Sequence, residues 1–155
     1  MRRWFEIDEI VHDRIQFAVI IAKRKGQFII VFNNKRIGWE LPGGNKEAGE
    51  TILKAAGREL FEETGAIKFD LTPFGIYEWK EVFGMVFLSE VIEMVDMPKF
   101  EIEEIKFVDS LPEGMNFGDM FYVFEKRWNE VKGNNLKRYS VDIDNLDELD
   151  KIMVG

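Results

Sequence analysis

The apolar residues of this chain fall into short blocks, and most blocks end at a turn signal. Residues 15–24 have a strongly apolar centre, Lys25-Gly26 is typical of a turn, and residues 27–32 form a second apolar block. This arrangement predicts a β-hairpin. Further strands are predicted at residues 67–71, 75–80, 82–91 and 105–108.

Two segments repeat their apolar residues with the period of an α-helix. In residues 51–64, four side chains share an arc of about 100°: Ile52, Leu53, Ala56 and Leu60. Thr51 is a suitable N-cap, and Gly65 suits a left-handed residue after the last turn. Residues 117–131 carry an aromatic stripe that is typical of a core-facing helix: Phe117, Phe121, Phe124 and Trp128. Strands and helices together predict a mixed sheet flanked by helices.

The first helix also carries three glutamates, which lie beside its apolar stripe. Glu59, Glu62 and Glu63 have the spacing i, i+3 and i+4, so they fall on one side of the helix. Like charges at this spacing repel, and carboxylates are costly to bury without partners. We therefore expect cations among them: Arg58 for one carboxylate, and hard divalent ions for the rest. A charged surface helix is the alternative interpretation.

The stretch from Gly44 to Ala66 resembles the Nudix box, G-x5-E-x7-R-E-U-x-E-E-x-G-U, where U is a bulky aliphatic residue. The matching residues are Gly44, Glu50, Arg58, Glu59, Leu60, Glu62, Glu63 and Gly65, with Ala66 as a small member of the last class. The resemblance implies an α/β (α+β) fold, a Nudix-type α/β/α sandwich with a mixed β-sheet between helices. Residues 1–135 would form this domain, and residues 136–155 would be an acidic tail or docking helix of the same domain.

Members of this family typically use Mg²⁺ or Mn²⁺ to cleave a nucleoside diphosphate linked to another group. By position, the resemblance implies these metal ligands: Glu59, Glu62, Glu63 and the backbone carbonyl of Gly43. Arg58 would orient Glu59 and its neighbours. Glu50 would support the loop–helix junction or a metal-bound water. Bound metals would neutralise the diphosphate, orient it and lower the pKa of the attacking water.

The group that accepts the proton of this water is left open. The chain has no cysteine and one histidine, His12, so a carboxylate is the best candidate. Family resemblance offers Glu59, or a glutamate of the acidic loop at residues 96–104, where Glu101 is favoured over Glu103 and Glu104. A solvated acidic loop without a catalytic role is the alternative.

The substrate is open as well. Trp39-Glu40-Leu41-Pro42-Gly43-Gly44 and the chain length resemble mutator-type pyrophosphohydrolases that act on nucleoside triphosphates such as 8-oxo-dGTP. This subgroup implies Asn116 as a reader of the purine edge, although Asn116 could simply start a helix. Lys35 and Arg36 could bind phosphates or form a solvated turn. Three aromatic residues could stack on a base or pack in the core: Phe74, Tyr77 and Trp79.

The alternative substrates are ADP-ribose, a nucleotide sugar or a capped RNA end. An alternative of another class is a nucleotide-binding module without catalytic activity.

The amino-acid composition limits the kinds of partner and metal site that the chain can have. The net charge of −8 disfavours a surface that coats long nucleic acids, and it requires cations wherever a phosphorylated substrate binds. The absence of cysteine excludes disulfides and thiolate metal sites. The longest uncharged run near the N-terminus, residues 15–22, is too short for a membrane span, so we expect a cytoplasmic protein without membrane partners. Both a monomer and a homodimer remain open.

Overall fold

A computed structural model of the chain describes residues 3–96 and 102–151. Its elements follow this order: β1 (Arg3–Phe5), η1 (His12–Arg14), β2 (Ile15–Arg24), β3 (Gln27–Asn33), β4 (Gly38–Glu40), β5 (Gly43–Asn45), α1 (Ile52–Thr64), β6 (Ala66–Trp79), β7 (Val82–Met94), β8 (Ile102–Val108), α2 (Met120–Val131), β9 (Tyr139–Asp142) and η2 (Ile143–Lys151). No helix within these residues is both long and apolar enough to cross a bilayer.

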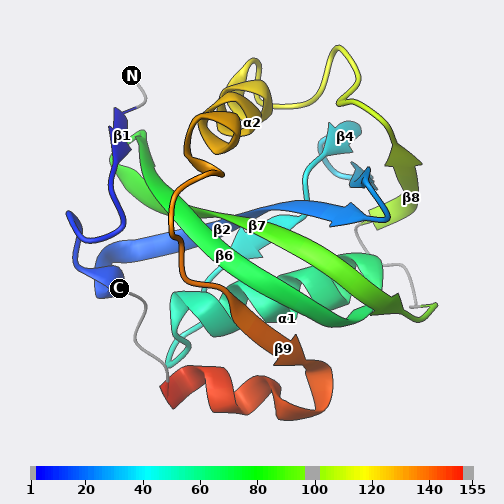
Figure 1. Ribbon diagram of the computed structural model, residues 1–155. Helices are drawn as coiled ribbons and strands as arrows, with labels where there is room; N and C mark the ends of the chain where they lie inside the picture. The colour runs from blue at the N-terminus through cyan, green and yellow to red at the C-terminus, as the bar shows by residue number, and fades with distance from the viewer. Residues whose placement is uncertain (1–2, 97–101, 152–155) are drawn as a thin grey trace.

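The strands form one mixed sheet with the order β1-β6-β7-β2-β3-β4, in which β5 also pairs with β2, β8 with β3, and β9 with β6. The pairing of β2 with β7 is parallel, and β2 with β3 and β6 with β7 are antiparallel. Helices α1 and α2 lie on opposite sides of the sheet, and η2 lies beyond α1 (Figure 1). The expected α+β architecture with a mixed sheet between helices is confirmed.

Because both faces of the sheet are covered, its central strands are apolar on both sides. Along β2, Ala18, Ile20 and Ala22 belong to the core cluster that includes the apolar stripe of α1. Val19 and Ile21 point to the other cluster, which includes the stripe of α2. The alternation follows from the two-residue period of a strand. The strand β2 therefore ties the two helical layers to a common frame.

Helix α1 matches the prediction closely. Thr51 caps it by accepting a hydrogen bond from the Lys54 backbone N–H at 3.2 Å, and Gly65 follows it with φ of 81°. The stripe residues Ile52, Leu53, Ala56 and Leu60 are all buried. The local signals and the burial pattern agree here, which is why the helix bounds could be predicted to within a residue.

Four predictions for other elements were wrong in part. Residues 67–71 and 75–80 are one strand, β6, because a register shift between Pro73 and Gly75 accommodates the proline without ending the strand. The helix predicted from Phe117 begins at Met120, since Phe117 and Gly118 both have positive φ. Strand β8 begins at Ile102, inside the predicted acidic loop. Within residues 136–155, predicted as an acidic tail or docking helix, the described part forms strand β9 and the 3-10 helix η2 and has no α-helix.

The packing of β1 on β6 gives a test of this fold. A Cβ at Gly75 would lie 1.8 Å from Cζ2 of Trp4, so Gly75→Ala should destabilise the protein by about 2 kcal/mol through overpacking. Urea unfolding would measure the change. Gly133→Ala is the matched control, because a Cβ there meets nothing within 4 Å. In a Trp4→Ala background most of the Gly75→Ala cost should disappear, and an undiminished cost would contradict this packing.

Candidate active site

The site begins where β5 lies against both β2 and α1. Gly44 pairs with Ala18 of β2, and its backbone faces the carboxyl group of Glu59 on α1. A Cβ at Gly44 would lie 2.4 Å from Cδ of Glu59, a distance that real contacts do not show. A side chain at this position would therefore displace the Glu59 carboxyl group from the place that it occupies beside the strand.

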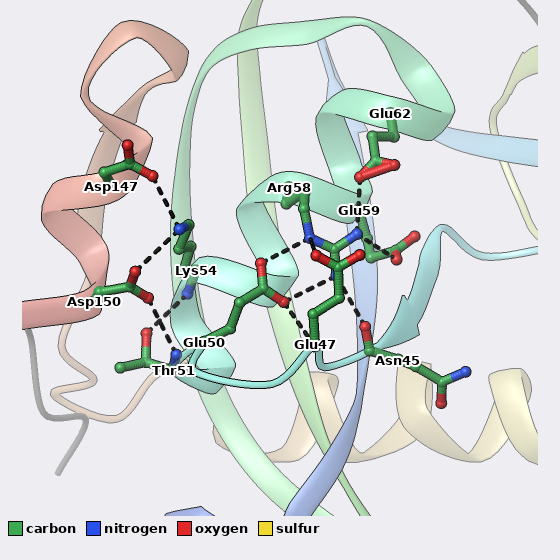
Figure 2. Close-up of polar contacts among 10 residues, drawn as sticks. All are labelled: Asn45, Glu47, Glu50, Thr51, Lys54, Arg58, Glu59, Glu62, Asp147 and Asp150. Carbon is green, nitrogen blue, oxygen red and sulfur yellow. Dashed lines mark hydrogen bonds and ion pairs between the residues drawn. The ribbon is translucent and has the colours of Figure 1, made fainter.

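Arg58 joins the carboxylates of this region into one network (Figure 2). Its Nε and Nη2 donate to the two oxygens of Glu50 at 2.7 and 3.0 Å, and its Nη1 donates to Glu59 and Glu62, both at 2.8 Å. Nη2 also donates to the backbone carbonyl of Asn45 at 2.9 Å. The side chain of Arg58 is only 14% exposed, so these bonds are poorly screened by water. Hydrogen bonding to Glu50, Glu62 and Glu59 raises the pKa of Arg58 in spite of its burial.

The carboxylates around Arg58 differ in their environment. Burial acts to raise the pKa of Glu50, but hydrogen bonds from Arg58 and from the Glu47 backbone N–H outweigh it and lower that pKa below its ordinary value. At Glu59, burial is the dominant influence and raises the pKa even though Arg58 is in contact. Glu62 has a half-exposed side chain. Glu50 is thus stabilised as a carboxylate by Arg58, whereas the contact with Arg58 does not fully offset the cost of burying the charge of Glu59.

Glu63 is the least compensated of the four. Its Oε1 accepts a hydrogen bond from the Gly43 backbone N–H at 2.8 Å. Burial raises the pKa of Glu63 to about 8, and this hydrogen bond offsets the effect only in part. A carboxyl group in this position calls for a positive partner.

Glu59 and Glu63 open into a cavity of about 500 Å³ between β2, β5, α1 and the start of α2. Its described lining is: Phe17, Ala18, Val19, Arg36, Glu40, Leu41, Gly43, Gly44, Asn45, Glu47, Glu59, Glu63, Tyr77, Trp79, Val82, Phe117, Met120 and Phe121. One end is rich in carboxylates and backbone oxygens, and the other is aromatic. Four glutamates and one arginine belong to this described lining, so the cavity is acidic.

The chemistry of these groups fits a hard divalent cation. Carboxylates and a backbone carbonyl are the oxygen ligands that Mg²⁺ prefers. Within residues 3–96 and 102–151, however, no three acidic or histidine side chains are gathered closely enough to enclose a metal ion. The reason is visible in the contacts, because Glu59 and Glu62 are both turned onto Arg58. A cation placed among Glu59, Glu62 and Glu63 would therefore compete with Arg58 for the first two carboxylates.

The aromatic end is fixed by a second buried carboxylate, Glu40. Arg36 makes a bidentate ion pair with it, with Nε and Nη2 at 2.7 and 2.8 Å from its oxygens. Asn116 donates to Glu40 Oε2 through Nδ2 at 2.8 Å, and its backbone N–H donates to the Trp39 carbonyl at 3.0 Å. Arg36 also lies 5.2 Å from the ring centre of Phe117. These contacts fasten the segment before α2 to β4.

The predicted site residues fall into three groups. The structure brings together Gly43, Glu50, Arg58, Glu59, Glu62 and Glu63 at the acidic end. It places Arg36 and Asn116 at the aromatic end, both on Glu40. Lys35 and Glu104 are outside the described lining of the cavity. Glu101 lies outside the described residues, and Glu103 is on β8. The functional roles of all these residues remain predictions.

The sequence interpretation missed three residues of the cavity. Glu40 was read only as part of a family-like segment, although a glutamate between Trp39 and Leu41 is a signal for a paired, buried carboxylate. Phe117 was assigned to the helical stripe, and its neighbour Gly118 was the available sign that the helix begins later. Phe17 reaches the cavity from β2, and no local signal marks it. Of the three aromatic candidates, Tyr77 and Trp79 line the cavity, while Phe74 packs against Trp4 and Trp128.

The fold is shared with solved Nudix structures. A mutant of the Bacillus subtilis pyrophosphohydrolase BsRppH superposes with a TM-score of 0.72 at 22% identity, covering 86% of this chain and 91% of that one. An ADP-ribose pyrophosphatase from Streptococcus suis 89-1591 superposes with a TM-score of 0.59 at 16% identity, covering 77% of this chain and 92% of that one. At these identities the likeness concerns the fold.

Curated sequences are also similar. A putative 8-oxo-dGTP diphosphatase of Bacillus subtilis (strain 168) is 30% identical over 105 residues, which is 67% of this chain and 58% of that protein. Phosphatase NudJ of Escherichia coli (strain K12) is 44% identical over 48 residues, 29% of this chain and 31% of that protein. The matches thus span less than two thirds of these relatives. The family model of the NUDIX domain matches residues 12–130, and the chain therefore belongs to the NUDIX domain family.

Proposed function

We propose that this protein is a divalent-metal-dependent hydrolase of a diphosphate linkage, and that its substrate is a nucleoside triphosphate, which it converts to the monophosphate and pyrophosphate. The observation that carries the proposal is the single cavity that joins Glu59 and Glu63 to the rings of Trp79 and Phe117. Such a cavity offers a place for phosphates at one end and for a planar base at the other. The similarity to a putative 8-oxo-dGTP diphosphatase supports an oxidised purine as the base.

The acidic lining supports a metal requirement. A polyphosphate would meet the glutamates of this cavity with Arg36 as the one cationic side chain of the described lining, and Arg36 is already paired with Glu40. We propose Glu59, Glu62, Glu63 and the Gly43 carbonyl as the groups that hold Mg²⁺ or Mn²⁺. The ion would neutralise the phosphates and lower the pKa of the attacking water.

The remaining residues would position these groups. Arg58 stays bound to Glu50 and releases Glu59 and Glu62 to the ion, because its fork has separate N–H groups for each partner. Glu59 faces the cavity and is our candidate for the group that accepts the water proton. Arg36 and Asn116 would shape the aromatic end through Glu40 rather than reach the substrate as independent groups.

A nucleotide panel tests the proposal. Purified protein would be incubated with nucleoside triphosphates, 8-oxo-dGTP, ADP-ribose and a nucleotide sugar, each with Mg²⁺ and with EDTA. We expect release of pyrophosphate from a triphosphate with Mg²⁺ and none with EDTA. If only ADP-ribose or a nucleotide sugar is hydrolysed, that compound takes the place of the triphosphate as the proposed substrate. If none of these compounds is hydrolysed, the proposed enzymatic activity is refuted.

Glu62→Gln tests the metal assignment. The variant keeps the shape of the side chain but removes a charged ligand, so kcat should fall by about 100-fold or more with the fold retained. Glu130→Gln, an exposed position at the end of α2, is the matched control and should keep the wild-type rate. A near-normal rate in Glu62→Gln would show that Glu62 does not hold the ion.

Glu63 should give the metal-free protein a defined pH dependence. Its pKa is about 8 in the folded protein against an ordinary value of 4.5, so between these pH values the folded protein retains a proton that the unfolded chain has released. Glu63 therefore adds its full contribution to the free energy of unfolding below pH 4.5, the pKa in the unfolded chain. This contribution is lost as the pH rises to about 8, the pKa in the folded protein. Urea unfolding in EDTA should show this fall, and Glu63→Gln should remove it.

The matched control for Glu63→Gln is Glu148→Gln, because Glu148 is an exposed carboxylate of η2. Its pH dependence should equal that of the wild type. Saturating Mg²⁺ should flatten the wild-type profile, since the cation then takes the place of the proton. An identical fall in wild type and Glu63→Gln would show that Glu63 is not the group responsible.

A further inference from the structure

Strand β9 joins the sheet beside β6, and η2, which follows it, lies against α1 on the side that faces away from the sheet (Figure 1). Strand β9 pairs with β6 at residues 139–142, which brings η2 beneath the first turns of α1. The family model ends at residue 130, so this segment is not part of the matched NUDIX domain. The helix that carries the candidate metal ligands therefore has an additional element bound to it.

The contacts concentrate on the N-terminal turn of α1. Thr51 Oγ1 donates to the Leu149 carbonyl at 2.9 Å, and the Thr51 backbone N–H donates to Asp150 Oδ1 at 3.2 Å. Lys54 Nζ lies 3.0 Å from Asp150 Oδ2 and 2.9 Å from Asp147 Oδ1. The N–H groups at a helix start have no partners within the helix, so such bonds reduce fraying of this turn.

A packing feature supports a close fit between the two elements. A Cβ at Gly57 would lie 2.9 Å from Cδ1 of Leu146 and 3.5 Å from Cδ1 of Leu149. Glycine within a helix costs about 1 kcal/mol relative to alanine. The missing side chain at Gly57 is what allows η2 to lie directly on α1.

The turn that η2 holds is directly connected to the carboxylate network. Thr51 follows Glu50, and Glu50 accepts two bonds from Arg58. Figure 2 shows the two sets of contacts side by side, with Asp147 and Asp150 of η2 around Lys54 at the left and Arg58 with its glutamates at the right. Lys54 and Arg58 lie one turn apart on α1. A displacement of Thr51 would thus move Glu50 relative to Arg58, and would disturb the group that orients Glu59 and Glu62.

We propose that residues 139–151 form a positioning element of the carboxylate site, in which Asp150 and Lys54 fix the first turn of α1 and thereby hold Glu50 against Arg58. The inference rests on the proposed function for its catalytic consequence. Asp150 and Lys54 are positioning residues, because they act through Thr51 and Glu50. Since small displacements at a reacting centre can lower rates by about 100-fold, the loss of this contact should be measurable.

Asp150→Ala tests the proposal, and Glu148→Ala is its matched control. Both variants remove one carboxylate from η2, but Glu148 pairs with Lys151 of the same segment and not with α1. In Asp150→Ala, kcat should fall by about tenfold, while the KM for the nucleotide should stay within about twofold, because the aromatic end is built by Trp79 of β6 and Phe117 before α2. Glu148→Ala should keep both values.

The NMR signal of the Arg58 Nε–H group gives a readout that needs no turnover. It can be assigned by its loss in Arg58→Lys, and it reports the bond to Glu50 directly. Asp150→Ala should shift this signal and accelerate its exchange with solvent, and Glu148→Ala should leave it unchanged. Asp150→Asn, which removes the ion pair with Lys54 but keeps the shape of the side chain, should act in the same direction to a smaller extent, and it decides the question if Asp150→Ala does not fold.

The outcomes separate the two proposals. If Asp150→Ala folds and keeps both the Arg58 signal and the wild-type kcat, the positioning element is refuted and the proposed function stands. An equal change in Glu148→Ala would also refute it, because the effect would then be one of charge alone. If the wild type turns over none of the diphosphate compounds, the proposed function fails, and the Arg58 signal alone decides whether the segment holds Glu50 in place.

Discussion

One guanidinium group organises the acidic half of this molecule. Arg58 lies on α1 and bonds to Glu50 before the helix, to the carbonyl of Asn45 at the end of β5, and to Glu59 and Glu62 on its own helix. Its planar fork reaches three segments at once, which the single ammonium group of a lysine could not do. The close approach of Gly44 to Glu59 depends on this arrangement, because Arg58 holds the Glu59 carboxyl group beside the strand.

The charges of this region do not balance, and the imbalance is informative. Arg58 donates hydrogen bonds to three glutamates and lies 3.7 Å from a fourth, Glu47. Burial raises the pKa of Glu63, and the Gly43 N–H and the charge of Arg36 offset this only in part. A protein whose acidic groups served only structure would have little reason to bury Glu63 without a cation. In the proposed metal site, Arg58 and a bound ion would share these carboxylates.

Sequence reasoning was most successful where local signals and burial coincide. The cap at Thr51, the residue Gly65 and the stripe of α1 could all be predicted because each depends on neighbours within a few residues. Prediction from the sequence failed where tertiary contacts decide the bounds of an element or the partners of a side chain. The continuity of β6 through Pro73 depends on a register shift against β7, and the late start of α2 depends on positive φ at Phe117. Glu40 was missed because its pairing with Arg36 depends on the turn between β3 and β4, and its other partner, Asn116, is 76 positions away in the chain.

The two ends of the cavity are built by different elements, and this explains why chemistry was easier to infer than substrate. The acidic end depends on β5 and α1, whose residues are close in sequence and fixed by the geometry of one helix. The aromatic end depends on Trp79 from β6 and Phe117 before α2, whose rings only the fold brings together. A family signature confined to residues 44–66 therefore constrains the bond that is cleaved far more than the molecule that carries it.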